Sequence, residues 1–335
     1  MGHSHDIPAE PAPTPPDHRQ NLADTLDARP DIAINDDYRD AMTLALDTMW
    51  NRYGDPNKPS YHAYHNDIHS YHVAIGSWIV LDFMRDELGL DVQDSDYAIG
   101  GLVGVLHDIV HDAELHEVKR EEDYIVDFGD FTVTVCNDGT KSNEELSAEC
   151  ALEFLTIRGF PAEIQQQVAS GIRLTEVSFE GGNVIQTRAG QGGCNFGGVA
   201  AAIADTDGIF AGRDRLTKDV ARLIVEILGD DVSDDGIVTT QITKFIEMEQ
   251  AFVDQKLGEF LLHMKGLEDD PEKLQQIMDA VHERFEPYRR RALGAAALFD
   301  AKLNDFQQLH DSIKARVDAI RHFINSSDTK LASDE

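Results

Sequence analysis

Two short apolar stretches of the chain concentrate histidine and aspartate, the side chains that bind divalent metal ions and transfer protons. The first, YHNDIHSYHV, occupies residues 64–73, and the second, VLHDIVHD, occupies residues 105–112. Titratable groups in apolar segments are costly to bury unless a partner satisfies them. Their density predicts that the two stretches contribute to one chemical site.

The spacing within each stretch separates two imidazoles by four residues. His65 and His69 are four residues apart, which is one helical turn. His107 and His111 have the same spacing, and Asp108 follows His107 directly. Imidazole nitrogens and carboxylate oxygens suit a first-row divalent metal, and three or four such groups suffice. We therefore predict that His69, His107 and Asp108 bind a metal ion from two helices.

A fourth ligand should be an acid on a third helix. The segment VAAAIADTDGIFAG, residues 199–212, supplies Asp205 in an otherwise apolar, alanine-rich helix. A buried aspartate needs a cationic partner, and a metal ion is one. Considered without the other ligands, Asp205 has a simpler interpretation as a helix cap or a salt-bridged acid.

The joint pattern resembles the HD-domain metal-dependent phosphohydrolase superfamily. YHNDIH followed by Val73 is similar to the YHNxxH…V signature of class I cyclic-nucleotide phosphodiesterases, and HDIVH is similar to their HDxxH. IAD at 203–205 is similar to their late Ala-Asp. NEELSA at 143–148 and DTDGIFAG at 205–212 also resemble predicted bacterial HD phosphohydrolases. The resemblance extends over roughly residues 45–260.

This resemblance implies a centre with two divalent metal ions. The first ion, zinc, iron or manganese, would be held by four ligands: His69, His107, Asp108 and Asp205. Asp108 would bridge to a second ion, magnesium or manganese. A hydroxide between the ions would attack phosphorus, because two cations lower the pKa of bound water from about 15.7 towards about 7.

The resemblance also implies roles for residues that do not bind metal. His65 would be the general acid that protonates the leaving alkoxide, because imidazole has an ordinary pKa of about 6.5. His111 and Glu144 would orient water molecules at the ions. Glu145 is the neighbouring alternative to Glu144.

Two features depart from the animal class I enzymes. Those enzymes continue HDxxHxG, whereas this chain reads HDIVHDAELHE. Their purine-binding glutamine lies in a QGD context, whereas this chain offers only MEQAFVDQKLGEF. In that segment Gln255, or alternatively Gln250, would contact the substrate. The departures concern the substrate pocket and leave the predicted metal ligands unchanged.

The elements that must position these residues are predicted to be helices. Apolar residues recur at three- and four-residue spacing over 36–54, 66–89, 96–110, 143–158, 161–174, 197–211, 213–229, 238–265, 271–290 and 291–325. We expect Asn66 to cap the helix that carries His69, and Ser142 or Asn143 to cap the next motif-bearing helix.

Two segments interrupt the helical pattern. DFGDFTVTVCNDG, residues 127–139, alternates apolar and polar side chains and predicts a small hairpin insertion. EGGNVIQTRAGQGGCNFGG, residues 180–198, is glycine-rich and predicts a loop or lid. Together with the resemblance, the pattern predicts an all-α fold: an HD-domain, phosphodiesterase-like helical bundle with one hairpin insertion.

Composition divides the chain into three parts. Residues 1–34 are rich in proline, alanine and aspartate, which predicts a disordered N-terminal arm. Residues 35–265 would form the HD-type catalytic domain. Residues 266–335 would form a helical C-terminal extension packed on the same domain.

The charge balance restricts the partners. The chain has 62 acidic and 29 basic residues, a formal net charge of −33. This field repels nucleic acid and anionic lipid, so we expect neither as a partner. A small-molecule nucleotide substrate would need local cations to approach.

Other features of the composition bear on location. The sequence lacks an apolar stretch near the roughly 18 residues of a membrane span, and its first residues lack the apolar region of a secretory signal. We therefore expect a cytoplasmic protein. The oligomeric state, including a homo-oligomer, is left open.

Three functions are compatible with these patterns. The first is a metal-dependent phosphodiesterase that hydrolyses a 3',5'-cyclic nucleotide such as cAMP or cGMP. The second is a broader HD phosphohydrolase that acts on a nucleotide monophosphate, a pyrophosphate or another small phosphoester. The third is a non-catalytic helical module that kept the fold for binding. The presence of every predicted ligand favours the two enzymatic interpretations.

Overall fold

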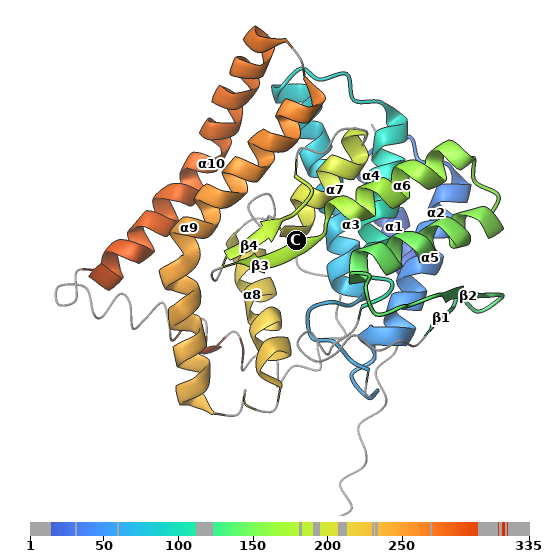
Figure 1. Ribbon diagram of the computed structural model, residues 1–335, viewed down its shortest axis with the longest axis horizontal. Helices are drawn as coiled ribbons and strands as arrows, with labels where there is room; N and C mark the ends of the chain where they lie inside the picture. The colour runs from blue at the N-terminus through green and yellow to red at the C-terminus, as the bar shows by residue number, and fades with distance from the viewer. Residues whose placement is uncertain are drawn as a thin grey trace, which may run out of the picture.

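The structure is a computed structural model, and it is mainly helical, which confirms the all-α class. It describes residues 15–30, 32–58, 60–111, 123–180, 183–189, 195–206, 213–229, 231, 234–268, 270–300, 314, 317, 318 and 320. Figure 1 shows the arrangement of the elements. No helix among these residues is both long enough and apolar enough to cross a lipid bilayer.

The elements follow one another along the chain in a simple order. The helices are α1 His18–Asp27, α2 Asp36–Met49, α3 Asp67–Asp82, α4 Asp94–Leu106, α5 Asn143–Ile157, α6 Ala162–Leu174, α7 Phe196–Thr206, α8 Arg213–Leu228, α9 Asp235–Leu267 and α10 Pro271–Asp300. One π-helical turn, Trp50–Gly54, extends α2, and another, Phe83–Glu87, extends α3. The strands are β1 Tyr124–Asp127, β2 Thr132–Val135, β3 Val177–Glu180 and β4 Asn183–Gln186.

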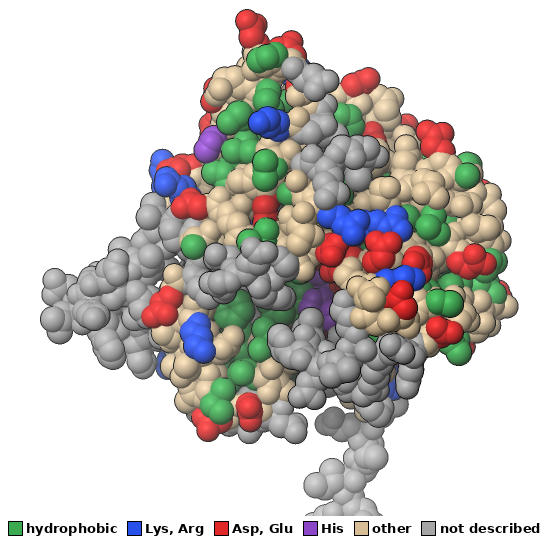
Figure 2. Space-filling model, in the orientation of Figure 1, with side chains coloured by type: hydrophobic (Ala, Val, Ile, Leu, Met, Phe, Trp, Pro, Cys, Tyr) green, Lys and Arg blue, Asp and Glu red, His purple; other side chains and the backbone are tan. Residues whose placement is uncertain are grey.

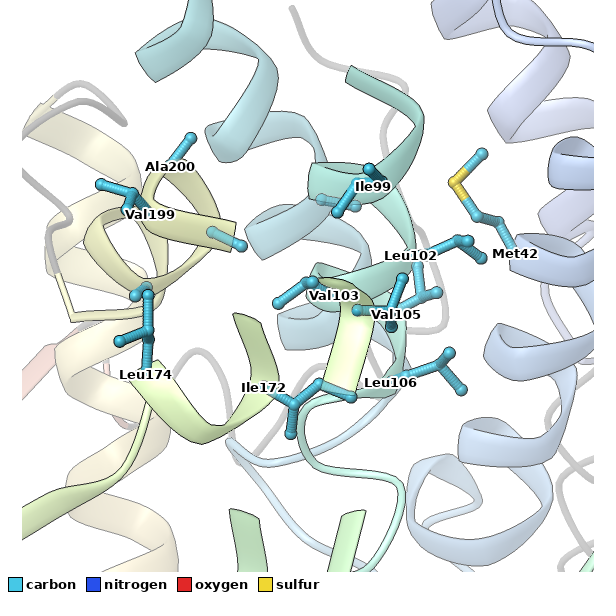
Figure 3. Packing of buried hydrophobic residues seen from close by; sticks show 14 of the residues in the cluster. Met42, Ile99, Leu102, Val103, Val105, Leu106, Ile172, Leu174, Val199 and Ala200 are labelled. Carbon is cyan, nitrogen blue, oxygen red and sulfur yellow. The ribbon is translucent and has the colours of Figure 1, made fainter. Parts of the chain in front are cut away.

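Helix α4 lies at the centre of the core. It is buried on every side from Asp96 to Leu106, as expected for a helix that is apolar all round. Helices α2, α3, α6 and α7 pack against it. In Figure 3, Leu102 points toward Met42 of α2, whereas Val103 points toward Ile172 of α6. The end of α4 is therefore held from several directions, and that end carries the HD motif.

Small residues allow α3, α4 and α7 to approach one another closely. A Cβ on Gly104 of α4 would lie 2.4 Å from the backbone nitrogen of Ala74 in α3. A Cβ on Gly76 of α3 would lie 3.0 Å from the Cβ of Ala204 in α7. A side chain at Gly104 would force α3 and α4 apart. The motif-bearing segments are close because these crossings are tight.

Both predicted helix caps are confirmed. The side chain of Asn66 accepts hydrogen bonds from the backbone N–H groups of Ile68 and His69, at 3.0 and 3.3 Å. Ser142 accepts one from the backbone N–H of Glu145 at 3.1 Å. Such caps satisfy donors that have no partner inside the helix. As a result, His69 lies in the first turn of α3, and His65 precedes the helix.

The predicted hairpin insertion is confirmed, and a second hairpin was not predicted. Strands β1 and β2 pair antiparallel, with Tyr124 opposite Val135. Strands β3 and β4 also pair antiparallel, with Val177 opposite Gln186. Because β4 lies inside the glycine-rich segment 180–198, the prediction of a loop is wrong for Asn183–Gln186. Residues 190–194 of that segment lie outside the described residues.

The predicted disordered arm contains a helix in its second half. Asp17 caps α1, and Leu22 and Leu26 of α1 are buried in the main core. The ring of His18, which is 1% exposed, binds Asp47 of α2 at 2.8 Å and Asp67 of α3 at 3.1 Å. The prediction of disorder is corrected for this part because three apolar or paired side chains anchor it. Residues 1–14 lie outside the described residues.

The C-terminal helices pack on the same core as the rest of the chain. Figure 1 shows α9 and α10, in orange, as an antiparallel pair along one side. The ring of Phe260 on α9 contacts Phe83 and Phe285 at centroid distances of 6.1 and 5.8 Å. Phe285 lies on α10, so this pair is joined to the end of α3 by aromatic packing. Residues 301–313 of the helix predicted over 291–325 lie outside the described residues.

The buried position of His18 generates a prediction about stability. Burial would lower the pKa of His18, but its hydrogen bonds to Asp47 and Asp67 raise it to about 9. We expect His18→Leu to lower the free energy of unfolding by about 3 kcal/mol at neutral pH, because Asp67 would keep a buried charge without its partner. Urea unfolding measures this loss.

The pH dependence of that loss has a defined sign. The folded pKa of His18 lies above its ordinary value of 6.5, so the stabilisation is fully present below that value and is lost as pH rises through about 9. The stability gap between wild type and variant should therefore shrink across this range. A gap of equal size on both sides of it would contradict the assignment.

Candidate metal centre

Four side chains from three helices converge in the interior, as predicted. His69 comes from the first turn of α3, and His107 is the residue at which α4 ends. Asp108 follows His107, and Asp205 lies in the last turn of α7. The two histidines and Asp108 are buried. The elements that carry these residues are far apart in sequence and meet only in the folded chain.

The distances among the donor atoms suit one cation. Oδ2 of Asp108 lies 3.0 Å from Nε2 of His107 and 3.5 Å from Nε2 of His69. Oδ1 of Asp205 lies 3.3 and 3.1 Å from the same two nitrogens, which are 3.2 Å from each other. Ligand bonds of roughly 2.0–2.2 Å place neighbouring donors about 3.0–3.5 Å apart around one ion. The spacing is therefore that of a group that could hold a metal ion.

The tautomer of His107 also favours ligation. Its Nδ1–H donates a hydrogen bond to the backbone carbonyl of Gly104 at 2.8 Å. In the neutral ring this leaves the lone pair on Nε2, the atom that faces the other ligands. A backbone carbonyl on the outer nitrogen is a common second contact of metal-binding histidines, because it fixes the ring and its tautomer.

The charges at this point favour a cation. Burial would raise the pKa of Asp108, but the neighbouring His107 lowers it well below its usual range. The pKa of Asp205 is also lowered, against the effect of burial, by His107 and His69. Oδ2 of Asp108 is buried and makes no hydrogen bond to the described residues. Two ionised, buried carboxylates with one unsatisfied oxygen are the donor set that a divalent ion stabilises.

A second group of histidines lies beside the four ligands. The rings of His65 and His111 stack at a centroid distance of 4.1 Å and an angle of 18°, and His62 meets His111 edge-on at 5.2 Å. Nitrogen atoms of these three rings lie within 4.8 Å of one another. Lone pairs lie in the ring planes, so two nearly parallel rings do not direct them at one point. This cluster suits proton transfer better than metal ligation.

Glu226 of α8 holds His65 and was not predicted from the sequence. Its carboxylate accepts hydrogen bonds from the backbone N–H groups of Tyr64 and His65, at 2.7 and 3.0 Å, and from the ring Nδ1–H of His65. The available signal was a single acid in the apolar run RLIVEIL, residues 222–228. Sequence spacing alone does not show which histidine such an acid reaches.

The two stacked imidazoles have opposite pKa shifts. Burial would lower the pKa of His65, but the hydrogen bond to Glu226 together with the charges of Asp108, Glu226 and Asp205 raises it. Burial, together with the charge of His65, lowers the pKa of His111 to about 3. Neighbouring groups with shifts in opposite directions are typical of acid–base pairs. The opposite shifts favour the protonated form of His65 and the neutral form of His111.

The two glutamates of the NEELSA motif have different environments. The pKa of Glu144 is raised, first by burial and also by the charge of Asp108. Glu145 instead forms a two-pronged pair with Arg173, at 2.8 and 3.0 Å, and lies 3.6 Å from Arg188. Because Glu145 is paired with arginine, Glu144 is the better candidate of the two for the site.

The structure does not bring Gln255 to the ligands through any described contact. Its amide donates a hydrogen bond to Glu259 at 2.9 Å, within α9. The side chain of the alternative, Gln250, lies outside the described residues.

Figure 2 shows a histidine side chain at the bottom of a hollow near the middle of one face, beside mixed basic and acidic side chains.

Searches against protein-family models, curated proteins and solved structures found no match to this chain.

The geometry predicts the consequences of removing a ligand. Wild-type protein freed of metal with a chelator should bind Co²⁺ or Zn²⁺, and Asp205→Ala should weaken that binding by more than about 100-fold, beyond the loss typical of an outer-shell change. Calorimetric titration measures both affinities. His72→Ala, on the same helix as His69 but outside the ligand set, is the matched control and should bind like wild type. Equal affinities for all three proteins would refute the site.

Proposed function

We propose that the chain is a metal-dependent phosphodiesterase that hydrolyses a phosphoester of a nucleotide, with a 3',5'-cyclic nucleotide as the leading substrate. The observation that carries this proposal is the convergence of His69, His107, Asp108 and Asp205 within donor distances of one ion. The cyclic nucleotide rests on the resemblance of the YHNxxH and HDxxH motifs to class I phosphodiesterases. The hydrolase chemistry rests on the type and spacing of the donors.

Two divalent ions are part of the proposal. Zinc, iron or manganese suits the four-ligand position, and magnesium or manganese suits the second position, next to Asp108. Oδ2 of Asp108 lies 3.0 Å from Nε2 of His107, and after the effect of His107 the charge of His65 also lowers the pKa of Asp108, so this carboxylate faces both the ligand group and His65. When bound, such ions neutralise phosphate charge and lower the pKa of water to about 7.

His65 is positioned to donate a proton to the leaving oxygen. Its Nδ1–H is held by Glu226, which leaves Nε2 as the nitrogen that faces away from that carboxylate. An imidazole oriented by a carboxylate delivers its proton along a fixed direction. Glu226 thus has a positioning role through His65, and its contacts to two backbone N–H groups fix its own carboxylate.

Glu144 and His111 are placed to orient water. A half-buried carboxylate accepts a hydrogen bond from a water molecule, and a neutral imidazole can accept or donate one. The backbone N–H of His111 donates to the hydroxyl of Tyr53 at 3.0 Å, which fixes the segment after α4. Nδ1 of His111 is buried without a hydrogen bond among the described residues. A water molecule is the natural partner for that nitrogen.

One observation favours the broader alternative. Gln255, the residue that would contact a purine, is bound to Glu259 on α9. A phosphohydrolase with this metal centre and another way of holding the rest of its substrate would act on a nucleotide monophosphate, a pyrophosphate or another small phosphoester. The non-catalytic alternative is less favoured, because the ligands, His65 and its partner Glu226 are all in place.

A substrate panel tests the proposal. Protein loaded with manganese should hydrolyse cAMP or cGMP, and chelation should abolish the activity, which phosphate release or nucleotide chromatography measures. Hydrolysis of p-nitrophenyl phosphate without turnover of either cyclic nucleotide would reject the cyclic substrate and support the broader alternative. Metal binding with no hydrolysis of any phosphoester would support the non-catalytic module.

The leaving group tests the role of His65. His65→Gln should lower kcat about 10²–10⁴-fold for a poor leaving alkoxide, because general acids contribute on this scale. It should lower kcat far less for p-nitrophenolate, which needs no proton. Glu226→Gln should show the same selectivity with a smaller loss. Equal losses for both leaving groups would remove the acid role from His65.

A further inference from the structure

A buried polar network lies between β4, α7 and α9, apart from the four candidate ligands and the histidine cluster. Its members are Gln186 of β4 and Lys256, Glu259 and His263 of α9, none more than 6% exposed. Lysine and glutamate are almost never fully buried unless they are paired. A network of this kind at the interface of three elements therefore needs a physical reason.

Every described bond in the network involves Glu259 or Gln186. The carboxylate of Glu259 accepts from Nζ of Lys256 at 2.5 Å and from the amide of Gln255 at 2.9 Å. It also accepts from the backbone N–H of Gln186 at 3.0 Å, which joins α9 to β4. His263 donates through Nε2–H to the side-chain oxygen of Gln186 at 3.1 Å. Both the main chain and the side chain of Gln186 are thus fixed from α9.

The remaining bonds of Gln186 reach the metal-bearing helix. Its Nε2 donates to the backbone carbonyl of Ala202 at 2.6 Å and to Oγ1 of Thr206 at 3.3 Å. These two residues flank Asp205 in the last turn of α7. The last carbonyls of a helix lack intrahelical partners, and helix ends fray easily. A metal ligand on such a turn depends on external contacts to keep its position.

Stability alone does not explain the network. Replacing a buried ion pair by apolar side chains of similar volume is often neutral or stabilising, because taking the charges out of water is costly. Burial lowers the pKa of His263 to about 4, so this ring is a neutral hydrogen-bond donor and adds no charge. What the network provides is geometry, since each hydrogen bond has a preferred length and direction.

We propose that Gln186 is a positioning residue for the metal centre: held by Glu259 and His263, it fixes the last turn of α7 so that Oδ1 of Asp205 stays within 3.1–3.3 Å of His69 and His107. This inference rests on the proposed metal site. In this proposal the β3–β4 hairpin and α9 contribute to metal affinity, although both are distant in sequence from the HD motif.

The chain offers a matched pair of glutamines for the experiment. Gln165 of α6 also donates from Nε2 to a backbone carbonyl, that of Phe160, at 2.7 Å, and it contacts none of the four ligands in the described bonds. Gln186→Met and Gln165→Met therefore remove the same type of bond by the same substitution. Co²⁺ affinity, the visible absorption of the Co²⁺ complex and the thermal unfolding of the metal-free protein are measured for both variants and for wild type.

We expect Gln186→Met to lower Co²⁺ affinity about 10–100-fold and to change the absorption bands, as changes in outer-shell partners do. Gln165→Met should leave affinity and spectrum unchanged, whatever its effect on unfolding. If Gln186→Met is not recovered folded, Gln186→Asn keeps the amide but is too short to reach α7, and the same loss of affinity is expected.

Three outcomes would overturn the inference. Loss of thermal stability in Gln186→Met with wild-type affinity and spectrum would make the residue merely structural. Equal losses of affinity in both variants would indicate general destabilisation. Failure of wild-type protein to bind Co²⁺ would reject the metal site itself, and the positioning role with it. The first two outcomes reject the positioning role of Gln186 but leave the proposed function intact. Failure of the positioning role can therefore be told apart from failure of the proposed function.

Discussion

The structure depends on one electrostatic constraint: the carboxylates of Asp108 and Asp205 lie together in the interior, against two imidazole nitrogens. Burying one unpaired carboxylate costs several kcal/mol, and two within reach of the same point cost more unless a cation is shared. His107 can supply part of that charge, as its pKa, which burial alone would lower, is raised well above its usual value by Asp108 and Asp205. A divalent ion supplies all of it without consuming a proton. Positive charge at this point therefore stabilises the two buried carboxylates.

Helix packing makes this convergence possible. The close crossings at Gly104 and Gly76 bring α3, α4 and α7 nearer than side chains would permit, and the buried face of α4 holds the crossing in place. Each candidate ligand lies at or near a helix end, where the backbone turns away and leaves room for a polar group. The apolar core and the polar site are therefore formed by the same helices, which exclude water through their packing and also carry the donor side chains.

The charge of the surroundings is consistent with this assignment. Near Glu144 the arginines Arg173 and Arg188 are already paired with Glu145 and, for Arg188, with Glu176 at 2.7 Å. These arginines therefore offer little net positive charge to a phosphate in a chain of net charge −33. In the proposed function, the attraction for phosphate comes from the ions and from protonated His65. The acidic surface then repels anions that bind non-specifically more than it repels the substrate.

Sequence alone determined the features that depend on local pattern: the helical class and the caps at Asn66 and Ser142. The four-residue spacing of the histidines did not place them on one helix face, because His65 precedes α3 and His111 follows the end of α4. The sequence also pointed to the four side chains that converge, because buried acids and imidazoles in apolar segments need partners. It did not reveal Glu226, the contacts of Gln186, the β3–β4 hairpin or the docking of α1 through His18. Those features depend on which segments meet after folding, with sequence separations of 161 residues for Glu226 and His65 and 77 for His263 and Gln186. Local periodicity carries no information about such pairings, since the packing of whole helices decides them.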